Sequence, residues 1–195
     1  MKFQSGFIYH IYNQSNRKDI LFKDNTDYVT FLEKVRTWII PNCELLSYCI
    51  MPNHYHFLAL ANDQSVSLKI LGSLTSNELS NGFRNAQSQY AQYFNDKYNL
   101  SGSVFRPKPK AKCLNEGDQD YSWTCFSYIH QNPVKAGLCE SPFDWKFSSA
   151  QEIKNGHNSP LVNLTALENY LGVNTKNIDE ELSTYPIEHK LKRIF

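Results

Sequence analysis

The spacing of apolar residues changes along the chain, and these changes predict where strands and helices lie. Runs rich in aromatic and β-branched residues predict strands, whereas apolar residues three and four positions apart predict helices. In chain order, the predicted elements are a strand at 6–13, a helix at 24–40, strands at 43–51 and 54–62, a helix at 78–98, an extended edge strand at 103–114 and a helix at 121–132. This order predicts an α+β fold of the split βαβ type, an antiparallel sheet with helices packed mainly on one face.

The helix predicted at 121–132 is expected to stop before Pro133, because proline lacks the amide hydrogen that a helix interior needs. A short turn would follow, with Asn132 as its N-cap and Gly137 as its stop. We expect residues 1–155 to form one domain and residues 156–195 to form a C-terminal tail that is docked on it or regulatory.

Composition and charge narrow the class of protein. The chain has 195 residues, 41% of them hydrophobic, which is typical of a folded globular protein. Its formal net charge of +1 creates no global field, so affinity for nucleic acid would require a local basic patch. The amino terminus is too polar for a signal peptide, and no apolar run reaches about 18 residues. Five cysteines without metal-site spacing suit reduced thiols, so we expect a cytoplasmic protein without membrane contact.

The segment MPNHYHFLAL, residues 51–60, carries two histidines one residue apart within a predicted strand. Side chains at alternate positions of a strand point to the same side, so His54 and His56 form a pair of imidazoles while Tyr55 faces the opposite layer. Neutral imidazole is a common metal ligand. The alternative is an incidental pair on a solvated face of the sheet.

A second polar constellation lies 72 residues after His56, in the segment YIHQNPVKAGL. Tyr128 and Asn132 are four residues apart and therefore share one face of the predicted helix. His130 points to another side of the helix, so we interpret it as a structural or solvent-facing residue. A core aromatic and a helix cap are the alternative interpretations of Tyr128 and Asn132.

Basic residues alternate with other residues in the segment SVFRPKPKAKC. In an extended chain this period places four cations on one side, a pattern suited to a phosphate backbone: Arg106, Lys108, Lys110 and Lys112. The alternative is an edge strand that lysines and prolines protect from aggregation. Weaker candidates for phosphate contacts are Arg17, Arg84 and Lys135.

Five segments together resemble the single-tyrosine HUH transposases, and most closely the REP-associated tyrosine transposases: YHIYN, MPNHYHFL, YAQYFNDKY, SGSVF and YIHQNPVKAGL, within residues 6–150. The resemblance implies an RRM- or ferredoxin-like sheet and a metal-dependent enzyme that nicks and rejoins single-stranded DNA at hairpins. It also implies that His54 and His56 bind Mg²⁺ or Mn²⁺, with Asn132 as a further ligand. Tyr128 is then the nucleophile, which leaves a 5′-phosphotyrosine and a free 3′-hydroxyl.

The chain departs from the family's sequence pattern at one loop, and other functions and oligomeric states stay open beside the one that the resemblance implies. The loop NQSN, residues 13–16, replaces the Asn-Arg-Gly sequence common in such proteins, which leaves Arg17 as the substitute for an arginine contact there. A non-catalytic nucleic-acid-binding module on the same fold is the main alternative, and a hydrolase using the histidine pair would need further Asp or His ligands. No G-x-x-x-x-G-K-[ST] motif is present, so no nucleotide cofactor is expected. We expect a monomer with its site in cis, and a dimer is the alternative.

Overall fold

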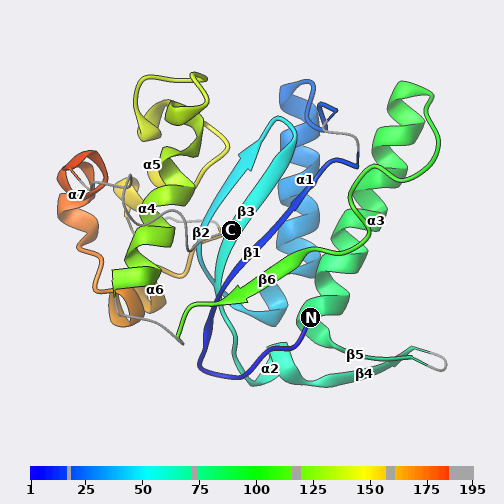
Figure 1. Ribbon diagram of the computed structural model, residues 1–195, viewed down its shortest axis with the longest axis horizontal. Helices are drawn as coiled ribbons and strands as arrows, with labels where there is room; N and C mark the ends of the chain where they lie inside the picture. The colour runs from blue at the N-terminus through cyan, green and yellow to red at the C-terminus, as the bar shows by residue number, and fades with distance from the viewer. Residues whose placement is uncertain (17–18, 72–73, 116–119, 157–160, 185–195) are drawn as a thin grey trace.

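The central element of the fold is a four-stranded antiparallel sheet. The computed structural model describes residues 1–16, 19–71, 74–115, 120–156 and 161–184. The strands lie in the order β2-β3-β1-β6, with these bounds: β1 (Ile8–Gln14), β2 (Glu44–Met51), β3 (His54–Leu60) and β6 (Lys110–Cys113). Figure 1 shows this sheet with helices packed around it, so the predicted α+β class is confirmed.

Three long helices flank this sheet: α1 (Asn25–Trp38), α3 (Glu78–Tyr98) and α4 (Asp120–Lys135). Tyr55 of β3 lies 5.3 Å from Phe31 of α1 and 6.4 Å from Phe83 of α3, measured between ring centroids. The next residue, His56, lies 5.5 Å from Tyr128 of α4. Since neighbouring strand residues point to opposite faces, α1 and α3 cover one face and α4 lies over the other (Figure 1).

A glycine allows α1 and α3 to approach each other closely. A Cβ atom added to Gly82 of α3 would lie 2.2 Å from the carbonyl oxygen of Trp38, the last residue of α1. No side chain fits in that space, and the obstacle is a backbone atom that cannot rotate away. The helix pair that supports the sheet therefore requires glycine at this position.

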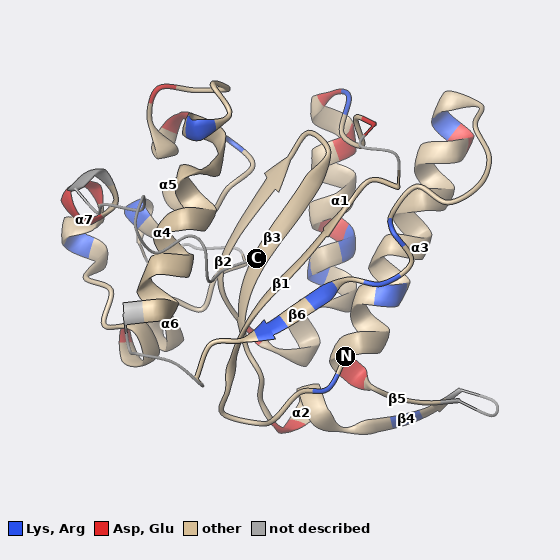
Figure 2. Ribbon diagram, viewed as in Figure 1, with Lys and Arg blue, Asp and Glu red and all other residues tan. Residues whose placement is uncertain are grey.

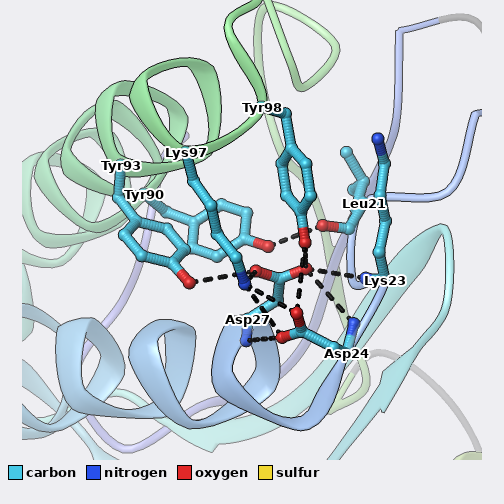
Figure 3. A network of polar contacts seen from close by, with 8 residues as sticks. All are labelled: Leu21, Lys23, Asp24, Asp27, Tyr90, Tyr93, Lys97 and Tyr98. Atoms are coloured by element: carbon cyan, nitrogen blue, oxygen red, sulfur yellow. Dashed lines mark hydrogen bonds and ion pairs between the residues drawn. The ribbon is translucent and has the colours of Figure 1, made fainter.

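A buried carboxylate also joins these two helices (Figure 3). The Asp27 side chain is fully buried, and it accepts hydrogen bonds from the hydroxyls of Tyr93 and Tyr98 at 3.0 and 2.8 Å. Lys97 Nζ lies 2.8 Å from Asp27 and 2.8 Å from Asp24, the residue that caps α1 in a capping box. The first turn of α1 is thereby tied to the last turns of α3.

The basic segment pairs with β1 in two separate parts. The backbone amide of Arg106 donates to the carbonyl of Gln14 at 3.0 Å, whereas Lys110 is the register partner of Tyr12. Four positions of the basic segment thus span two positions of β1, so the residues around Lys108 form a bulge. The predicted continuous strand at 103–114 is wrong in this detail, because two prolines remove the amide hydrogens that ladder pairing would use.

The predicted end of the helix at 121–132 is also wrong, because α4 continues through Pro133 to Lys135. Asn132 is therefore inside the helix and is not an N-cap. Proline removes only one helical hydrogen bond, and its fixed φ suits a helix, so a position in the last turn is tolerated. Gly137, with φ of 68°, follows the helix as predicted.

Shorter elements complete the described chain. They are η1 (Ile40–Asn42), α2 (Asp63–Val66), the hairpin of β4 (Leu68–Leu71) and β5 (Leu74–Asn77), η2 (Pro142–Asp144), α5 (Ala150–Asn155), α6 (Leu164–Leu171), η3 (Thr175–Asn177) and α7 (Ile178–Thr184). The Asn163 amide donates to the Leu45 carbonyl of β2 at 2.8 Å, and Gln131 Nε2 of α4 donates to the Leu182 carbonyl at 2.7 Å. Residues 161–184 thus contact the sheet and α4, and the division at residue 155 stays a prediction. Among the helices of the described ranges, none is long and apolar enough to cross a membrane.

Candidate functional site

The two histidines of β3 lie on the face of the sheet that α4 covers. In the β1–β3 register, His56 lies opposite Tyr12 and His54 lies opposite Gln14. The ring centroids of the two histidines are 5.0 Å apart. Tyr55, between them, is fully buried in the opposite layer, as the alternation of the strand predicted. The pair of imidazoles is therefore a product of strand geometry alone.

The hydrogen bond of His54 determines which of its ring nitrogens carries the proton. Its Nδ1 lies 2.7 Å from the amide oxygen of Asn53. An amide oxygen only accepts, so Nδ1 donates and Nε2 retains its lone pair. Burial lowers the pKa of His54 to about 4, so the ring is neutral at neutral pH. A neutral ring with a free Nε2 lone pair is a competent metal ligand.

His56 is buried more deeply and has one ring nitrogen without a hydrogen-bond partner. Its Nδ1 lies 2.9 Å from Nε2 of His10, a residue of β1. Its Nε2 is buried and meets no hydrogen-bond partner within the described residues. Burial, with smaller contributions from His10 and His54, holds the pKa of His56 well below its usual range. A buried ring nitrogen without a partner is uncommon in a folded protein and requires an explanation.

Tyr128 of α4 faces these histidines. The Tyr128 ring lies edge-on to His56 and His10, with centroids 5.5 and 6.4 Å away. The side chain is 8% exposed, so it retains a narrow opening to solvent. Burial raises the pKa of Tyr128 to about 12, although a hydrogen bond from the Asn132 side chain acts in the opposite direction. The phenol is therefore protonated at neutral pH.

Two further polar residues of α4 that the sequence singled out, Asn132 and His130, each have hydrogen-bond partners within the fold. The Asn132 amide Nδ2 donates to the Tyr128 carbonyl oxygen at 3.1 Å, and Asn132 does not line the pocket described next. Its role as a metal ligand stays a prediction. His130 is fully buried, with Nε2 2.8 Å from the Ser149 hydroxyl and Nδ1 3.0 Å from the Phe126 carbonyl. His130 is therefore structural, one of the two interpretations offered by the sequence.

A pocket of about 290 Å³ opens beside the histidines and the tyrosine. Its lining contains the following residues: Tyr12, Asn13, Gln14, His54, His56, Arg106, Lys108, Lys110 and Tyr128. Three of them are cations and none is acidic, so the pocket favours an anion. With the Gln14 amide turned so that its oxygen faces Arg106, this oxygen accepts from the guanidinium through Nη2 and through Nε at 2.7 Å. That contact holds the guanidinium at the pocket.

The predicted stripe of cations follows β6 and the bulge before it. Figure 2 shows Lys and Arg positions in blue on the ribbon of β6 and the adjoining segment. Lys110 Nζ lies 5.8 Å from the centroid of the Tyr12 ring, whereas Lys112 lies farther along, opposite His10, with Nζ 5.2 Å from the Tyr121 ring centroid. In the described part of the chain, no acidic side chain forms an ion pair with any of the four. Three cations of the stripe thus line the pocket, and Lys112 extends it.

The weaker candidates for phosphate contacts, Arg84 and Lys135, do not line the pocket. Arg84 lies on α3, which covers the opposite face of the sheet, and its Nη2 donates to Asn81 Oδ1 at 2.6 Å. Lys135 is exposed at the end of α4 and does not line the pocket. Arg17 lies outside the described residues. Phosphate contacts at these three positions stay predictions.

Three residues of β1 at the site received no metal-binding or catalytic role from the sequence, although His10 and Tyr12 lie in the segment YHIYN: His10, Tyr12 and Gln14. They alternate along β1, so strand geometry places all three on one face. The sequence did contain a signal for these residues. Any strand that pairs with β3 must place alternate residues on the face that carries His54 and His56. The register that decides which face, however, is a long-range property.

The donors at this site suit a divalent cation. Two neutral imidazoles can each present Nε2, and neither Nε2 has another partner in the residues that the structure describes. Within the same residues, no group of three or more His, Cys, Asp or Glu side chains is arranged so that it could hold a metal ion by itself. Further ligands would then be oxygens of amides, phenols, water or substrate, which Mg²⁺ and Mn²⁺ prefer. The residues therefore fit the predicted ion, whose binding stays a prediction.

Comparison with known proteins supports the fold. No protein-family model matches the sequence, and no curated protein matches it. Among solved structures, a REP-associated tyrosine transposase bound to a REP hairpin matches with a TM-score of 0.55 and 18% sequence identity, over 84% of this chain and 87% of that chain. A bacterial tRNA(His) guanylyltransferase-like protein in complex with ATP matches with a TM-score of 0.43 and 14% identity, over 94% and 73% of the respective chains. The first similarity confirms the predicted resemblance at the level of the fold.

Proposed function

We propose that this protein is a metal-dependent endonuclease and strand-transferase for single-stranded DNA, with Tyr128 as its nucleophile. One observation carries the proposal: the pair His54 and His56 and the phenol of Tyr128 line a single pocket whose charged residues are all cations. A metal site suits one non-bridging phosphate oxygen, and the adjacent phenol suits attack on the same phosphorus. Each part alone has a structural explanation, but their convergence does not.

The chemistry is a transesterification that balances without a cofactor to supply energy. The Tyr128 oxygen forms a bond to phosphorus, and the bond from phosphorus to the 3′-oxygen breaks. The phenol loses its proton and the departing 3′-hydroxyl gains one. The products are a 5′-phosphotyrosine and a free 3′-hydroxyl, and the reverse reaction rejoins strands. Because the phosphotyrosine retains the bond energy, no nucleotide cofactor is required.

Each group of the pocket has a defined task in this proposal. His54 and His56 would hold Mg²⁺ or Mn²⁺, which polarises the phosphate when bound and favours attack on it. Arg106, held by Gln14, and Lys108 bind the phosphates next to the scissile one. Burial raises the pKa of the Tyr128 phenol, so attack on phosphorus would require removal of its proton as the new bond forms.

The substrate we propose is a DNA hairpin with adjacent single-stranded sequence, as for REP-associated transposases. The structural neighbour is bound to a REP hairpin, and its fold is shared over most of both chains. A single-stranded segment would lie along the cations of the bulge and β6, where phosphate contacts are independent of sequence. His56 and Tyr128 meet within one chain, which supports a monomer with its site in cis.

The proposal is tested by covalent capture. Labelled single-stranded hairpins are incubated with protein and Mn²⁺ and then separated on a denaturing gel. Wild type is expected to yield a labelled protein band, and Tyr128→Phe and EDTA are each expected to abolish it. Tyr12→Phe is the matched control, because it removes the other phenol that lines the pocket and should retain the band.

Other outcomes separate the alternatives. A band that Tyr12→Phe abolishes and Tyr128→Phe retains would assign the nucleophile to β1 instead of α4 and refute the mechanism. Salt-sensitive binding of the hairpins without any band would indicate a nucleic-acid-binding module. Cleavage that persists in Tyr128→Phe would indicate a hydrolase that uses water.

A further inference from the structure

His10 is a fully buried histidine to which the proposed function assigns no task. It lies on β1, and its Nε2 is 2.9 Å from Nδ1 of His56. Its own Nδ1 is buried and has no hydrogen-bond partner within the described residues. A buried polar ring with only one partner is costly for a fold, so its presence needs an explanation.

The contact between the two rings allows only two arrangements of protons. In the first, His56 donates from Nδ1 to His10 Nε2, and His56 Nε2 keeps a lone pair directed away from the contact. In the second, His10 donates from Nε2, and His56 carries its proton on Nε2. Only the first arrangement leaves His56 able to bind a cation through Nε2.

We infer that His10 is a positioning residue, which accepts the Nδ1 proton of His56 and so presents the Nε2 lone pair of His56 to the divalent cation. This inference deepens the proposed function and rests on its metal site. His10 itself does not bind the cation in this arrangement, because its Nε2 accepts from His56 and its Nδ1 carries the proton of the neutral ring.

The symmetry between the two proposed ligands supports this assignment. Nδ1 of His54 donates to the Asn53 amide oxygen at 2.7 Å, which leaves its Nε2 free. His10 occupies the equivalent place behind His56, with an imidazole nitrogen as the acceptor. Metal-binding histidines commonly donate their second ring nitrogen to such a partner, which fixes the tautomer and the ring orientation.

The surroundings of His10 keep its ring in place. The ring stacks on Tyr12 with a centroid distance of 4.8 Å and an interplanar angle of 27°. The His56 ring lies edge to edge with it, with centroids 5.1 Å apart, and the Tyr12 and His56 centroids are themselves 5.8 Å apart. Fully buried on an interior strand and in contact with both rings, His10 has little freedom to turn its acceptor away from His56.

Two substitutions of His10 distinguish the loss of its hydrogen-bond acceptor from a change in side-chain volume. His10→Phe fills a similar space without an acceptor, whereas the amide oxygen of His10→Gln can take the position of Nε2. We expect His10→Phe to weaken Mn²⁺ binding by about 10- to 100-fold, the usual effect of losing such a partner. His10→Gln is expected to restore most of the affinity. Calorimetric titration with Mn²⁺ measures both, and thermal unfolding shows that each variant is folded.

A second readout does not depend on metal. In ¹⁵N NMR of metal-free protein with labelled histidine, His56 of wild type and of His10→Gln should carry its proton on Nδ1. In His10→Phe the Nε2-protonated form should gain population, because the acceptor for Nδ1 is gone.

The outcomes distinguish this inference from the proposed function. Equal Mn²⁺ affinity of folded His10→Phe and wild type would overturn the role of His10 and leave the metal site intact. Failure of the wild type to bind Mn²⁺ would refute the metal site itself. An Nε2-protonated His56 in the wild type would overturn the role of His10 in either case.

Discussion

The cations of the pocket predict how strongly salt should weaken DNA binding. Arg106, Lys108, Lys110 and Lys112 follow one edge of the sheet, and none is paired with an acidic side chain among the residues that the structure describes. Lys108 is exposed and lies in the bulge, so Lys108→Gln removes one charge without leaving a buried group unpaired. This variant is therefore a clean probe of the path that DNA takes.

The magnitude follows from counterion release. Four phosphate contacts with single-stranded DNA give a slope of log affinity against log salt of about −2.8. Between about 50 and 200 mM salt, the affinity of the wild type should thus fall about 50-fold. Lys108→Gln should reduce the slope to about −2.1, which corresponds to a fall of about 20-fold over the same range.

The assay is fluorescence anisotropy of a labelled single-stranded oligonucleotide in KCl with EDTA, which removes any contribution of a divalent ion. Arg84→Gln is the matched control, because Arg84 carries the same charge but lies on α3, on the opposite face of the sheet. Its slope should equal that of the wild type. An unchanged slope for Lys108→Gln together with a reduced slope for Arg84→Gln would show that DNA follows the α3 face, and would refute the assignment of the pocket.

Three further predictions concern the helix pair and the site. Gly82→Ala should lower the free energy of unfolding by about 1–3 kcal/mol in urea, because its Cβ would meet the Trp38 carbonyl; an unchanged midpoint would contradict the close contact. Asp27→Asn should cost about 1.5–3 kcal/mol by weakening its charge-assisted hydrogen bonds. Burial raises the pKa of Asp27, but bonds from a lysine and tyrosines outweigh it and lower the pKa overall, so stability should fall as pH drops below about 4. Thermal unfolding against pH should show a weaker dependence in the variant. An equal mixture of His56→Ala and Tyr128→Phe should form no covalent product, and a restored band would indicate a site shared between two chains.

Local periodicity was sufficient for the parts of this protein that depend on one element at a time. The alternation of a strand predicted that His54 and His56 share a face and that Tyr55 is buried on the other, and both features are present. Within β6 the same alternation places Lys110 and Lys112 on one side, whereas Arg106 and Lys108 reach the pocket from the segment before β6. These predictions succeed because side-chain direction within an element is set by backbone geometry.

Two local rules were too strict for this fold. Pro133 was expected to end α4, yet the helix continues for two more residues, because a single lost hydrogen bond in the last turn is tolerated. The basic segment was expected to be one extended strand, yet its prolines produce a bulge that carries Lys108 into the pocket. In both cases the prolines do disturb regular hydrogen bonding, but the resulting change in structure differs from the one predicted.

Only the tertiary structure decided which elements meet. The sequence by itself determined the strand and helix order, the shared face of His54 and His56 and the composition of the basic segment, because these are local. Contact of Tyr128 with His56, the placement of His10 behind His56 and the separation of Arg84 from the pocket depend on strand register and on which face each helix covers. Register and helix placement minimise the free energy of the whole core, so no single stretch of sequence encodes them.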